Sequence, residues 1–128
     1  MHSRVYYHIV WTTRQRQPVL DRATVAFLER YLRVIAKEER THIIALGIVR
    51  THVHVLLQAA TVTSLPRLMQ RFKGGSSVLI NREHHREHDL PVRWAKGYAI
   101  HSVGWRALEV ARRYVEEQDA RHPDERII

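Results

Sequence analysis

Hydrophobic residues in the first half of the chain change from strand spacing to helix spacing and back again. The β-branched and aromatic run at 5–13 predicts a strand. Asp21 can then cap a helix that reaches about Arg40, because apolar residues recur there at helical spacing, at Val25, Leu28, Leu32 and Ile35. Two strand-like runs, 43–49 and 51–58, follow with one residue between them, which indicates a tight hairpin or a bent pair.

The second half continues with the same two spacings. Pro66 follows a Thr-Ser-Leu sequence typical of a helix start, and the helix carries an apolar stripe at Leu65, Leu68, Met69 and Phe72. The polar stretch 81–91 predicts a loop, 96–104 a strand between glycines, and about 107–120 a final helix with the tail trailing off it. The order β-α-β-β-α-β-α predicts one α+β domain over residues 1–128. It is typical of a ferredoxin-like sandwich, in which helices cover an antiparallel sheet.

The charge of the chain narrows its class of partner. Lys and Arg number 21 against 13 Asp and Glu, which gives a net charge of +8 with histidine neutral. Such an excess favours a polyanionic partner, and nucleic acid ahead of a membrane, since no segment approaches the roughly 18 consecutive apolar residues of a span. The chain has no cysteine, which excludes disulfides and thiolate metal sites. We expect a cytoplasmic protein.

Two histidines interrupt the second run of the hairpin, in the sequence THVHVLLQ. Residues i and i+2 of a strand point to the same face, with Cα atoms roughly 7 Å apart. His52 and His54 should therefore project side by side, while the valines that follow each of them face the other way. Two adjacent imidazoles can share one divalent metal ion. The alternative is that both are partly exposed strand residues, one of them hydrogen-bonded at the sheet surface.

The final helix offers a third polar group. Successive positions of ALEVARRYVEEQ, 107–118, advance by roughly 100°. Its charged residues fall on one half, and Tyr114 and Gln118 fall on the other, one turn apart among small residues. A glutamine on a packing face needs polar partners, and its carbonyl oxygen can serve as a metal ligand beside the two histidines. The alternative is that Tyr114 only packs its ring and Gln118 borders solvent near the helix end.

HVH in a strand and YVEEQ on the last helix together resemble the HUH single-tyrosine transposases of the insertion-sequence 200/605 family. The likeness extends over nearly the whole chain. YHIVWTTRQRQPVL is similar to the family's first strand and basic turn, SLPRLMQRFKGGSS to its second helix, and KGYAIHSVG to its last strand. Two positions depart from the family pattern: Thr51 stands where many members have Asn, and Ala99 where an aromatic residue is common. We expect neither to touch the implied metal ligands or nucleophile, so both should affect DNA preference more than chemistry.

The resemblance implies an endonuclease and transposase of the HUH type. Tyr114 would attack a phosphodiester of single-stranded DNA, form a 5′-phosphotyrosine intermediate and release a 3′-hydroxyl for later rejoining. His52, His54 and Gln118 would hold one Mg²⁺ or Mn²⁺ ion. Family members recognise hairpins at the element ends and work as homodimers, in which the final helix of one protomer completes the site of the other. Composite sites are therefore expected, and the alternative is a self-contained site in each protomer.

Basic residues near these elements are implied to bind the DNA. Three lie in turns beside the strands and three on or just after the second helix: Arg14, Arg16, Arg50, Arg67, Arg71 and Lys73. Taken one at a time, each fits a solvated surface charge better, so the case for DNA binding rests on the cluster. The other histidines, among them His8 and His122, receive no ligand role.

Three functions are compatible with the sequence. The first is a metal-dependent transposase that nicks and joins the ends of its own element. The second is a repeat-associated tyrosine nuclease, with the same chemistry directed at chromosomal palindromes. The third is a non-catalytic nucleic-acid-binding module in which the histidines are structural. A zinc hydrolase built on His52 and His54 is less favoured, because no acidic third ligand or general base has suitable spacing. The transposase is the working hypothesis.

Overall fold

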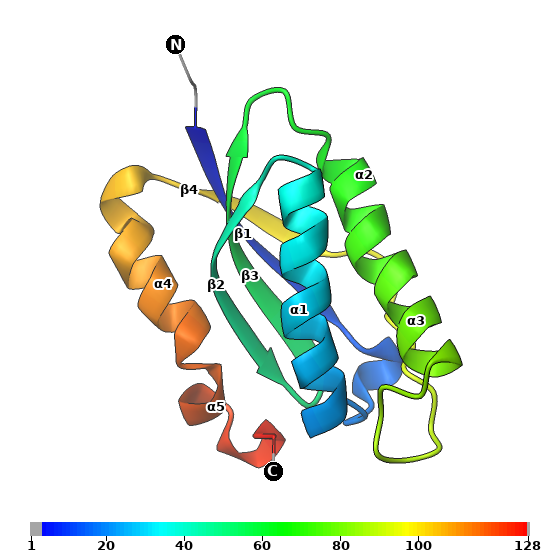
Figure 1. Cartoon of the computed structure of the whole chain (residues 1–128). Coiled ribbons are helices and arrows are strands. Elements are labelled where there is room, and N and C mark those ends of the chain that lie inside the picture. The colour runs from blue at the N-terminus through cyan, green and yellow to red at the C-terminus, as the bar shows by residue number, and fades with distance from the viewer. Residues whose placement is uncertain (1–3, 128) are drawn as a thin grey trace.

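The sheet contains four strands, β1 (Arg4–Thr12), β2 (His42–Val49), β3 (His52–Ala60) and β4 (Ala99–Val103). The structure is a computed structural model and describes residues 4–127. All strand pairs are antiparallel, and the order β2-β3-β1-β4 puts β1 and β3 at the centre (Figure 1). With helices joining and covering these strands, this is the ferredoxin-like α+β arrangement predicted from the sequence.

Helices α1 (Arg22–Glu38), α2 (Leu65–Gln70) and α3 (Ser76–Arg82) cover one face of the sheet. The predicted helix starts are confirmed by their caps. The Asp21 carboxylate accepts from the Thr24 amide at 3.0 Å, and the Ser64 hydroxyl accepts from the Arg67 amide at 3.3 Å. A π-helical turn, Arg71–Gly75, joins α2 to α3, so the two run on as one rod beside α1 (Figure 1).

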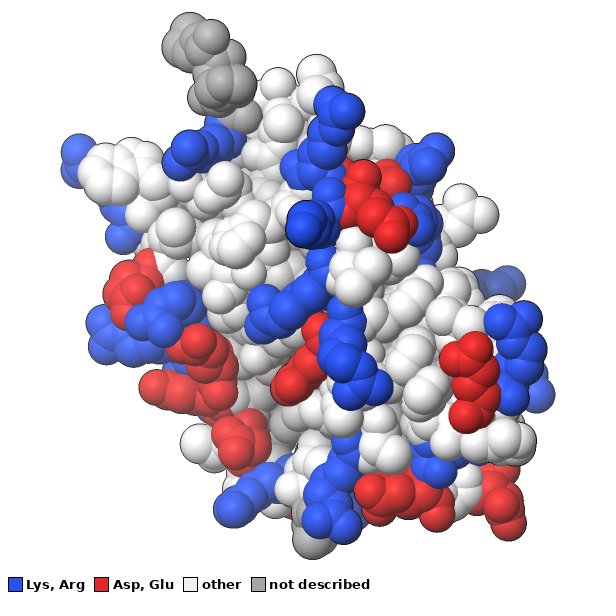
Figure 2. Space-filling view, viewed as in Figure 1, with Lys and Arg blue, Asp and Glu red and all other residues white. Residues whose placement is uncertain are grey.

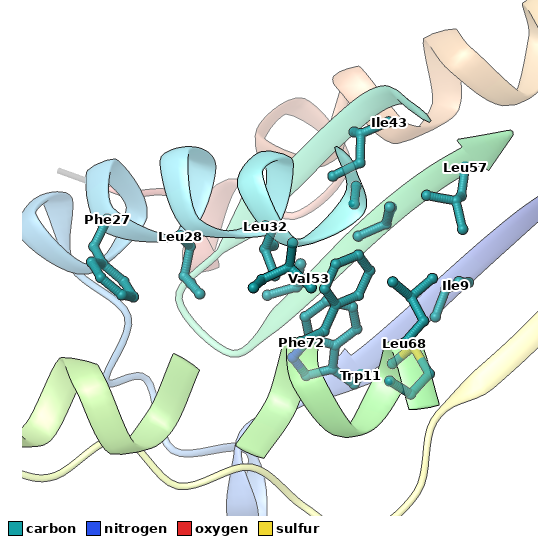
Figure 3. Packing of buried hydrophobic residues seen from close by; sticks show 14 of the residues in the cluster. Ile9, Trp11, Phe27, Leu28, Leu32, Ile43, Val53, Leu57, Leu68 and Phe72 are labelled. Atoms are coloured by element: carbon teal, nitrogen blue, oxygen red, sulfur yellow. The ribbon is translucent and has the colours of Figure 1, made fainter. Parts of the chain in front are cut away.

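The main hydrophobic core lies between this face of the sheet and the three helices. Figure 3 shows side chains from α1, from the α2–α3 rod and from the strands meeting there, among them Leu28, Leu32, Leu68, Phe72, Val53 and Leu57, all fully buried. Each such side chain contributes roughly 1.5–3 kcal/mol by leaving water. A slip of β3 by one residue would turn His52 and His54 into this core, so the packing fixes the face on which they lie.

Helix α4 (Leu108–Glu116) covers the opposite face, against β2 and β3. Its buried Val115 packs in a small cluster with Ala45 and Leu56. Gly47 on β2 permits this close approach, because a Cβ there would lie 1.9 Å from the Val115 carbonyl oxygen. Gly47 is also the pairing partner of His54. The end of α4 is therefore held directly against the strands that carry the two histidines.

The predicted strand at 96–104 is shorter than expected, since only residues 99–103 form β4. The reason lies in Lys73, whose ammonium group donates to the carbonyls of Ala95 and Gly97 at 2.8 and 2.6 Å. Gly97 also has a φ of +78°, which takes the backbone out of strand geometry. These contacts hold 95–97 as a loop that leads into the strand.

The final helix and the tail also differ from prediction. The helix expected over 107–120 is broken at Glu117, which separates α4 from the single turn α5 (Gln118–Arg121). The tail, expected to trail off, folds back onto the turn between β2 and β3. There the Arg50 amide donates to the Glu125 carbonyl at 2.8 Å, and the Arg50 guanidinium donates to the Arg126 carbonyl at 3.0 Å.

Candidate active site

His52 and His54 lie on β3, on the face covered by α4, as the strand spacing predicts. The intervening Val53 and the following Val55 point into the main core on the other face. The ring centroids of the two histidines are 5.0 Å apart. Only 4% and 5% of their surfaces are exposed, so the interpretation of both as partly exposed strand residues is wrong.

Burial sets the charge of the histidine pair. Desolvation lowers the pKa of His52. It lowers the pKa of His54 to about 3, with the positive charges of His52, His8 and His122 adding to the effect. Both imidazoles are therefore neutral at neutral pH, and each keeps one ring nitrogen with a lone pair. That is the form of histidine that binds a metal ion.

A third histidine, His8 on β1, shares this face. Its Nε2 lies 2.7 Å from Nδ1 of His54, and the two rings stack with centroids 5.0 Å apart. Burial lowers the pKa of His8 as well, and the charge of His101 adds to the effect. A single hydrogen lies between the two nitrogens, donated by one ring to the other, so His8 restricts the orientation of the His54 ring. The contact depends on the register of β1 against β3, which the spacing of His8 did not reveal.

Gln118 reaches the pair from the first position of α5. Only 1% of its surface is exposed, so the buried placement is confirmed and the solvent-bordering alternative is wrong. Its amide nitrogen donates to the Tyr114 carbonyl at 2.8 Å. This contact turns its carbonyl oxygen toward His52, 3.5 Å from Nε2. The break at Glu117 ends α4 at this point and lets the Gln118 side chain turn back toward the sheet.

Tyr114 stands at the edge of the group, on α4. Its ring lies edge-on to those of His8 and His54, with centroids 5.7 and 5.8 Å apart. The Arg121 guanidinium is 4.5 Å from the centre of the Tyr114 ring, a cation–π distance. With 36% of its surface exposed, Tyr114 borders both the buried histidines and solvent. Its ring therefore packs, as the alternative interpretation held, but it does so beside the histidines and within reach of a ligand.

Tyr114 and Gln118 thus meet His52 and His54 within one chain. The packing half predicted for α4 is correct for Leu108, Ala111 and Val115, whereas Val110 on the same half is 68% exposed. A homodimer that exchanges α4 stays a prediction.

Two further residues contact this group and were not predicted. Thr51 Oγ1 lies 2.9 Å from His52 Nδ1 and donates to Glu125 Oε1 at 2.5 Å. The His122 ring lies edge-on to His52, with centroids 5.1 Å apart. The expectation that Thr51 stays clear of the implied metal ligands is wrong, because its hydroxyl contacts His52 directly. No sequence signal pointed to Glu125, since the tail was expected to leave the domain.

The family model described as "Transposase IS200 like" matches residues 1–118, which include Tyr114, Gln118 and all the residues of β1 and β3. The chain belongs to the IS200-like transposase family. The resemblance stated from the sequence is therefore confirmed. The last ten residues, with Glu125 among them, lie outside the part that the family model matches.

Solved structures agree with this IS200-like fold. One similar structure is a candidate transposase from Deinococcus radiodurans R1, with 22% identity and a TM-score of 0.70, covering 100% of this chain and 95% of that chain. Another is a REP-associated tyrosine transposase bound to a REP hairpin, with 10% identity and a TM-score of 0.72, covering 95% of this chain and 71% of that chain. The comparison with curated proteins gave no match.

The basic residues of this IS200-like transposase have different surroundings. Arg67 on α2 and Arg71 in the π-helical turn pair with the end of α1. Arg67 lies 3.0 Å from Glu39, and Arg71 lies 2.9 Å from Glu39 and 2.6 Å from Glu38. Lys73 holds the loop before β4, as described above. Figure 2 shows a band of Lys and Arg that runs down the face carrying α1, with Asp and Glu beside it.

Arg14 lies elsewhere, in a cavity of about 520 Å³ that it lines with Lys73, Arg93 and Trp94. Arg16 and Arg50 lie near the tail. The Arg16 guanidinium is 3.9 Å from the Glu125 carboxylate, and the Arg50 guanidinium donates to the Arg126 carbonyl. Binding of DNA by any of the six predicted basic residues stays a prediction. None of the helices described between residues 4 and 127 has the length and apolar character needed to cross a bilayer.

Proposed function

We propose that this transposase cuts and rejoins single-stranded DNA with Tyr114 as its nucleophile. The observation that carries the proposal is the position of a partly exposed tyrosine beside two buried, neutral histidines and a buried glutamine. A phosphate that reached Tyr114 from solvent would arrive next to this polar group.

Cutting and rejoining by Tyr114 is a transfer of the DNA phosphate to the tyrosine and back, and it needs no nucleotide cofactor. The Tyr114 hydroxyl oxygen attacks the phosphorus of a phosphodiester, a bond forms between them, and the bond from phosphorus to the 3′-oxygen breaks. The phenolic proton passes to solvent, and the released 3′-oxygen takes up a proton. The DNA is left attached to Tyr114 through its 5′-phosphate. Since one phosphodiester replaces another, a 3′-hydroxyl can later reverse the step and rejoin the strand.

Tyrosine needs help for this attack, because its ordinary pKa of about 10 keeps it protonated at neutral pH. The residues present fit one Mg²⁺ or Mn²⁺ ion, which would be held by His52, His54 and the Gln118 oxygen. Such an ion supplies polarisation of the phosphate and stabilises charge on the leaving oxygen. In the described residues, no three His, Cys, Asp or Glu side chains are grouped to hold a metal. The Gln118 oxygen is therefore the third protein ligand that we propose, with phosphate and water as the others.

We propose a DNA hairpin as the recognised feature. A structure similar to this chain is of a REP-associated tyrosine transposase bound to a REP hairpin. The same observation favours a second candidate, a repeat-associated tyrosine nuclease that acts on chromosomal palindromes with the same residues. The DNA around the gene separates the two, because matching element ends favour the transposase and scattered palindromic repeats favour the nuclease.

The proposal is tested with single-stranded oligonucleotides copied from both flanks of the gene. We expect cleavage with Mn²⁺ or Mg²⁺ and none with EDTA. His52→Ala or His54→Ala should abolish cleavage while hairpin binding persists, since phosphate contacts dominate affinity. Gln118→Ala should be milder, because water can replace one oxygen ligand. His101→Ala, a change at an exposed histidine on β4, is the control and should cleave normally. Binding without any cleavage by the unaltered protein would favour a non-catalytic module.

A further inference from the structure

The end of the chain touches the candidate active site, although it lies outside the part that the family model matches. Residues 123–125 form a short 3-10 turn, and backbone contacts to Arg50 fix it against the turn between β2 and β3. The Glu125 side chain is 18% exposed, and its carboxylate points toward Thr51 and His122. Its Oε1 lies 2.5 Å from the Thr51 hydroxyl, and its Oε2 lies 3.5 Å from Nδ1 of His122.

The Thr51 hydroxyl has two partners and one hydrogen. Besides Glu125, it lies 2.9 Å from Nδ1 of His52. A carboxylate can only accept hydrogen bonds, so the hydroxyl donates to Glu125. The hydroxyl oxygen must then accept from His52, and this requires that Nδ1 of His52 carries the ring hydrogen. The direction of both bonds therefore follows from the chemistry of the carboxylate.

The direction of these two hydrogen bonds decides which form of His52 Nε2 faces Gln118. With its hydrogen on Nδ1, the neutral His52 ring has a bare lone pair on Nε2. The Gln118 amide nitrogen is committed to the Tyr114 carbonyl, so the group opposite Nε2 is the Gln118 oxygen, also an acceptor. The two atoms are 3.5 Å apart, longer than the 2.7–3.2 Å of ordinary N–H···O bonds. Two buried acceptors that converge without a hydrogen between them favour a positive ion in that space.

We propose that Glu125 and Thr51 are positioning residues, which hold His52 in the Nδ1–H tautomer and leave its Nε2 free, facing the Gln118 oxygen, for a divalent cation. The arrangement is a carboxylate–hydroxyl–imidazole chain, in which the carboxylate comes from the tail and the imidazole from β3. The cation part rests on the proposed function, whereas the tautomer is a property of the metal-free protein.

The tautomer is tested on metal-free protein by the ¹⁵N chemical shifts of His52, which distinguish Nδ1–H from Nε2–H. We expect Nδ1–H in the unaltered protein. Thr51→Val keeps the shape of the side chain but removes the acceptor, so His52 should change to Nε2–H, which can donate to Gln118. Thr51→Ser should retain Nδ1–H. Thr41→Val removes another buried hydroxyl, one that donates to the Ala36 carbonyl, and should leave His52 unchanged.

Cation binding is measured separately, by calorimetry with Mn²⁺. Loss of an outer partner of a metal-binding histidine weakens metal affinity by roughly 10- to 100-fold. We expect that range for Thr51→Val and for Glu125→Ala, and no change for Thr41→Val or for Asp124→Ala, which removes an exposed carboxylate from the same turn. Thr51 and Glu125 both lie outside the main hydrophobic core. Thermal unfolding checks that each variant is folded.

The outcomes are separable. The positioning role is overturned if His52 is Nε2–H in the unaltered protein. It is also overturned if His52 stays Nδ1–H in Thr51→Val, whatever the result of the metal titration. The expected tautomer with no Mn²⁺ binding by the unaltered protein supports the positioning role and contradicts the proposed metal site. Mn²⁺ affinity that is equal in the unaltered protein, Thr51→Val and Glu125→Ala overturns the coupling of the tail to the cation.

Discussion

At the scale of single residues, the candidate site is a set of neutral imidazoles whose hydrogens are placed by neighbours. His8 contacts Nδ1 of His54 at 2.7 Å, and in the same way the Thr51 hydroxyl contacts Nδ1 of His52 at 2.9 Å. Such contacts occupy the Nδ1 atoms and restrict the planes of the rings.

His8→Ala should therefore weaken Mn²⁺ binding by roughly 10- to 100-fold. The His54 ring would lose its only described hydrogen-bond partner within residues 4–127 and its stacking neighbour. Calorimetry measures the effect. The control is His101→Ala, at the exposed residue that pairs with His8 from β4. Equal Mn²⁺ affinity in the His8 variant and this control would contradict the positioning of His54 by His8.

The same three histidines predict how the metal-free protein responds to acid. Burial lowers the pKa of His8, His52 and His54 in the folded protein, for His54 to about 3, whereas unfolded histidine has a pKa of about 6.5. Below about pH 6.5 these histidines bind protons in the unfolded chain but stay neutral in the folded chain. Stability is therefore fully present above pH 6.5 and is lost as the pH falls toward 3.

At pH 5 the loss from His54 alone is on the order of 2 kcal/mol, from 1.5 pH units at 1.36 kcal/mol each. Urea unfolding in EDTA at pH 7.5 and pH 5 measures it. His54→Gln should show a smaller difference between the two pH values. Equal stability of the unaltered protein at both would show that these histidines are not held neutral by folding.

Sequence alone predicted the residues whose position follows from local geometry. His52 and His54 share a face because strands alternate, and Tyr114 and Gln118 share one because a helix turns by 100° per residue. The contacts of His8 with His54 and of Thr51 with Glu125 depend on strand register and on the path of the tail, which arise from packing over long separations. No periodicity in the chain carries that information.

At the scale of elements, the site depends on how closely α4 approaches the sheet. Gly47 of β2 leaves room for the Val115 carbonyl and for the Gln118 side chain, whose Cγ would lie 2.9 Å from an added Cβ. Glycine in the middle of an apolar strand was not singled out in the sequence. The requirement for a residue without a side chain at position 47 is apparent only when α4 is placed against β2.

Gly47→Ala should push α4 outward and separate Gln118 from His52. We expect the free energy of unfolding to fall by about 1–3 kcal/mol, as is typical when extra volume is forced into a packed contact. DNA cleavage should fall markedly as well. Gly104→Ala is the matched control, because a Cβ there meets nothing within 4 Å and its φ is −68°. Chemical unfolding and cleavage assays measure both. A Gly47 variant as stable and active as the control would contradict the described contact between α4 and β2.

The elements themselves were predicted well where their signals are local. Asp21 and Ser64 mark helix starts by their side chains, and the hairpin of β2 and β3 follows from two adjacent apolar runs. The shortened β4 was missed because it results from tertiary hydrogen bonds, from Lys73 to the loop before the strand. The break at Glu117 was missed because no Gly or Pro marks it in the sequence.

At the scale of the whole molecule, α4 can stay with its own sheet or be exchanged between two protomers. In the single chain it covers β2 and β3 through a small cluster around Val115. The family resemblance predicts that a homodimer exchanges this helix. Exchange would keep the contacts of α4 with the strands, because the same residues would meet from the two protomers.

Mixed dimers separate exchange from a self-contained site. We pair a Tyr114→Phe chain with a His52→Ala chain, each inactive alone, and predict that cleavage returns on mixing. One of the two sites then combines an intact tyrosine with intact histidines. A mixture that stays inactive, although the two chains are shown to associate, would mean that each protomer keeps its own α4.

The central claim is that Tyr114 attacks DNA, and covalent capture tests it most directly. The protein is incubated with Mn²⁺ and single-stranded DNA from its own flanks, denatured, digested and mapped by mass spectrometry. We predict a nucleotide attached through its 5′-phosphate to Tyr114. Tyr114→Phe, which removes only the hydroxyl, should bind the same DNA and give no adduct. An adduct on another residue, or an undiminished yield from the Phe variant, would contradict the claim.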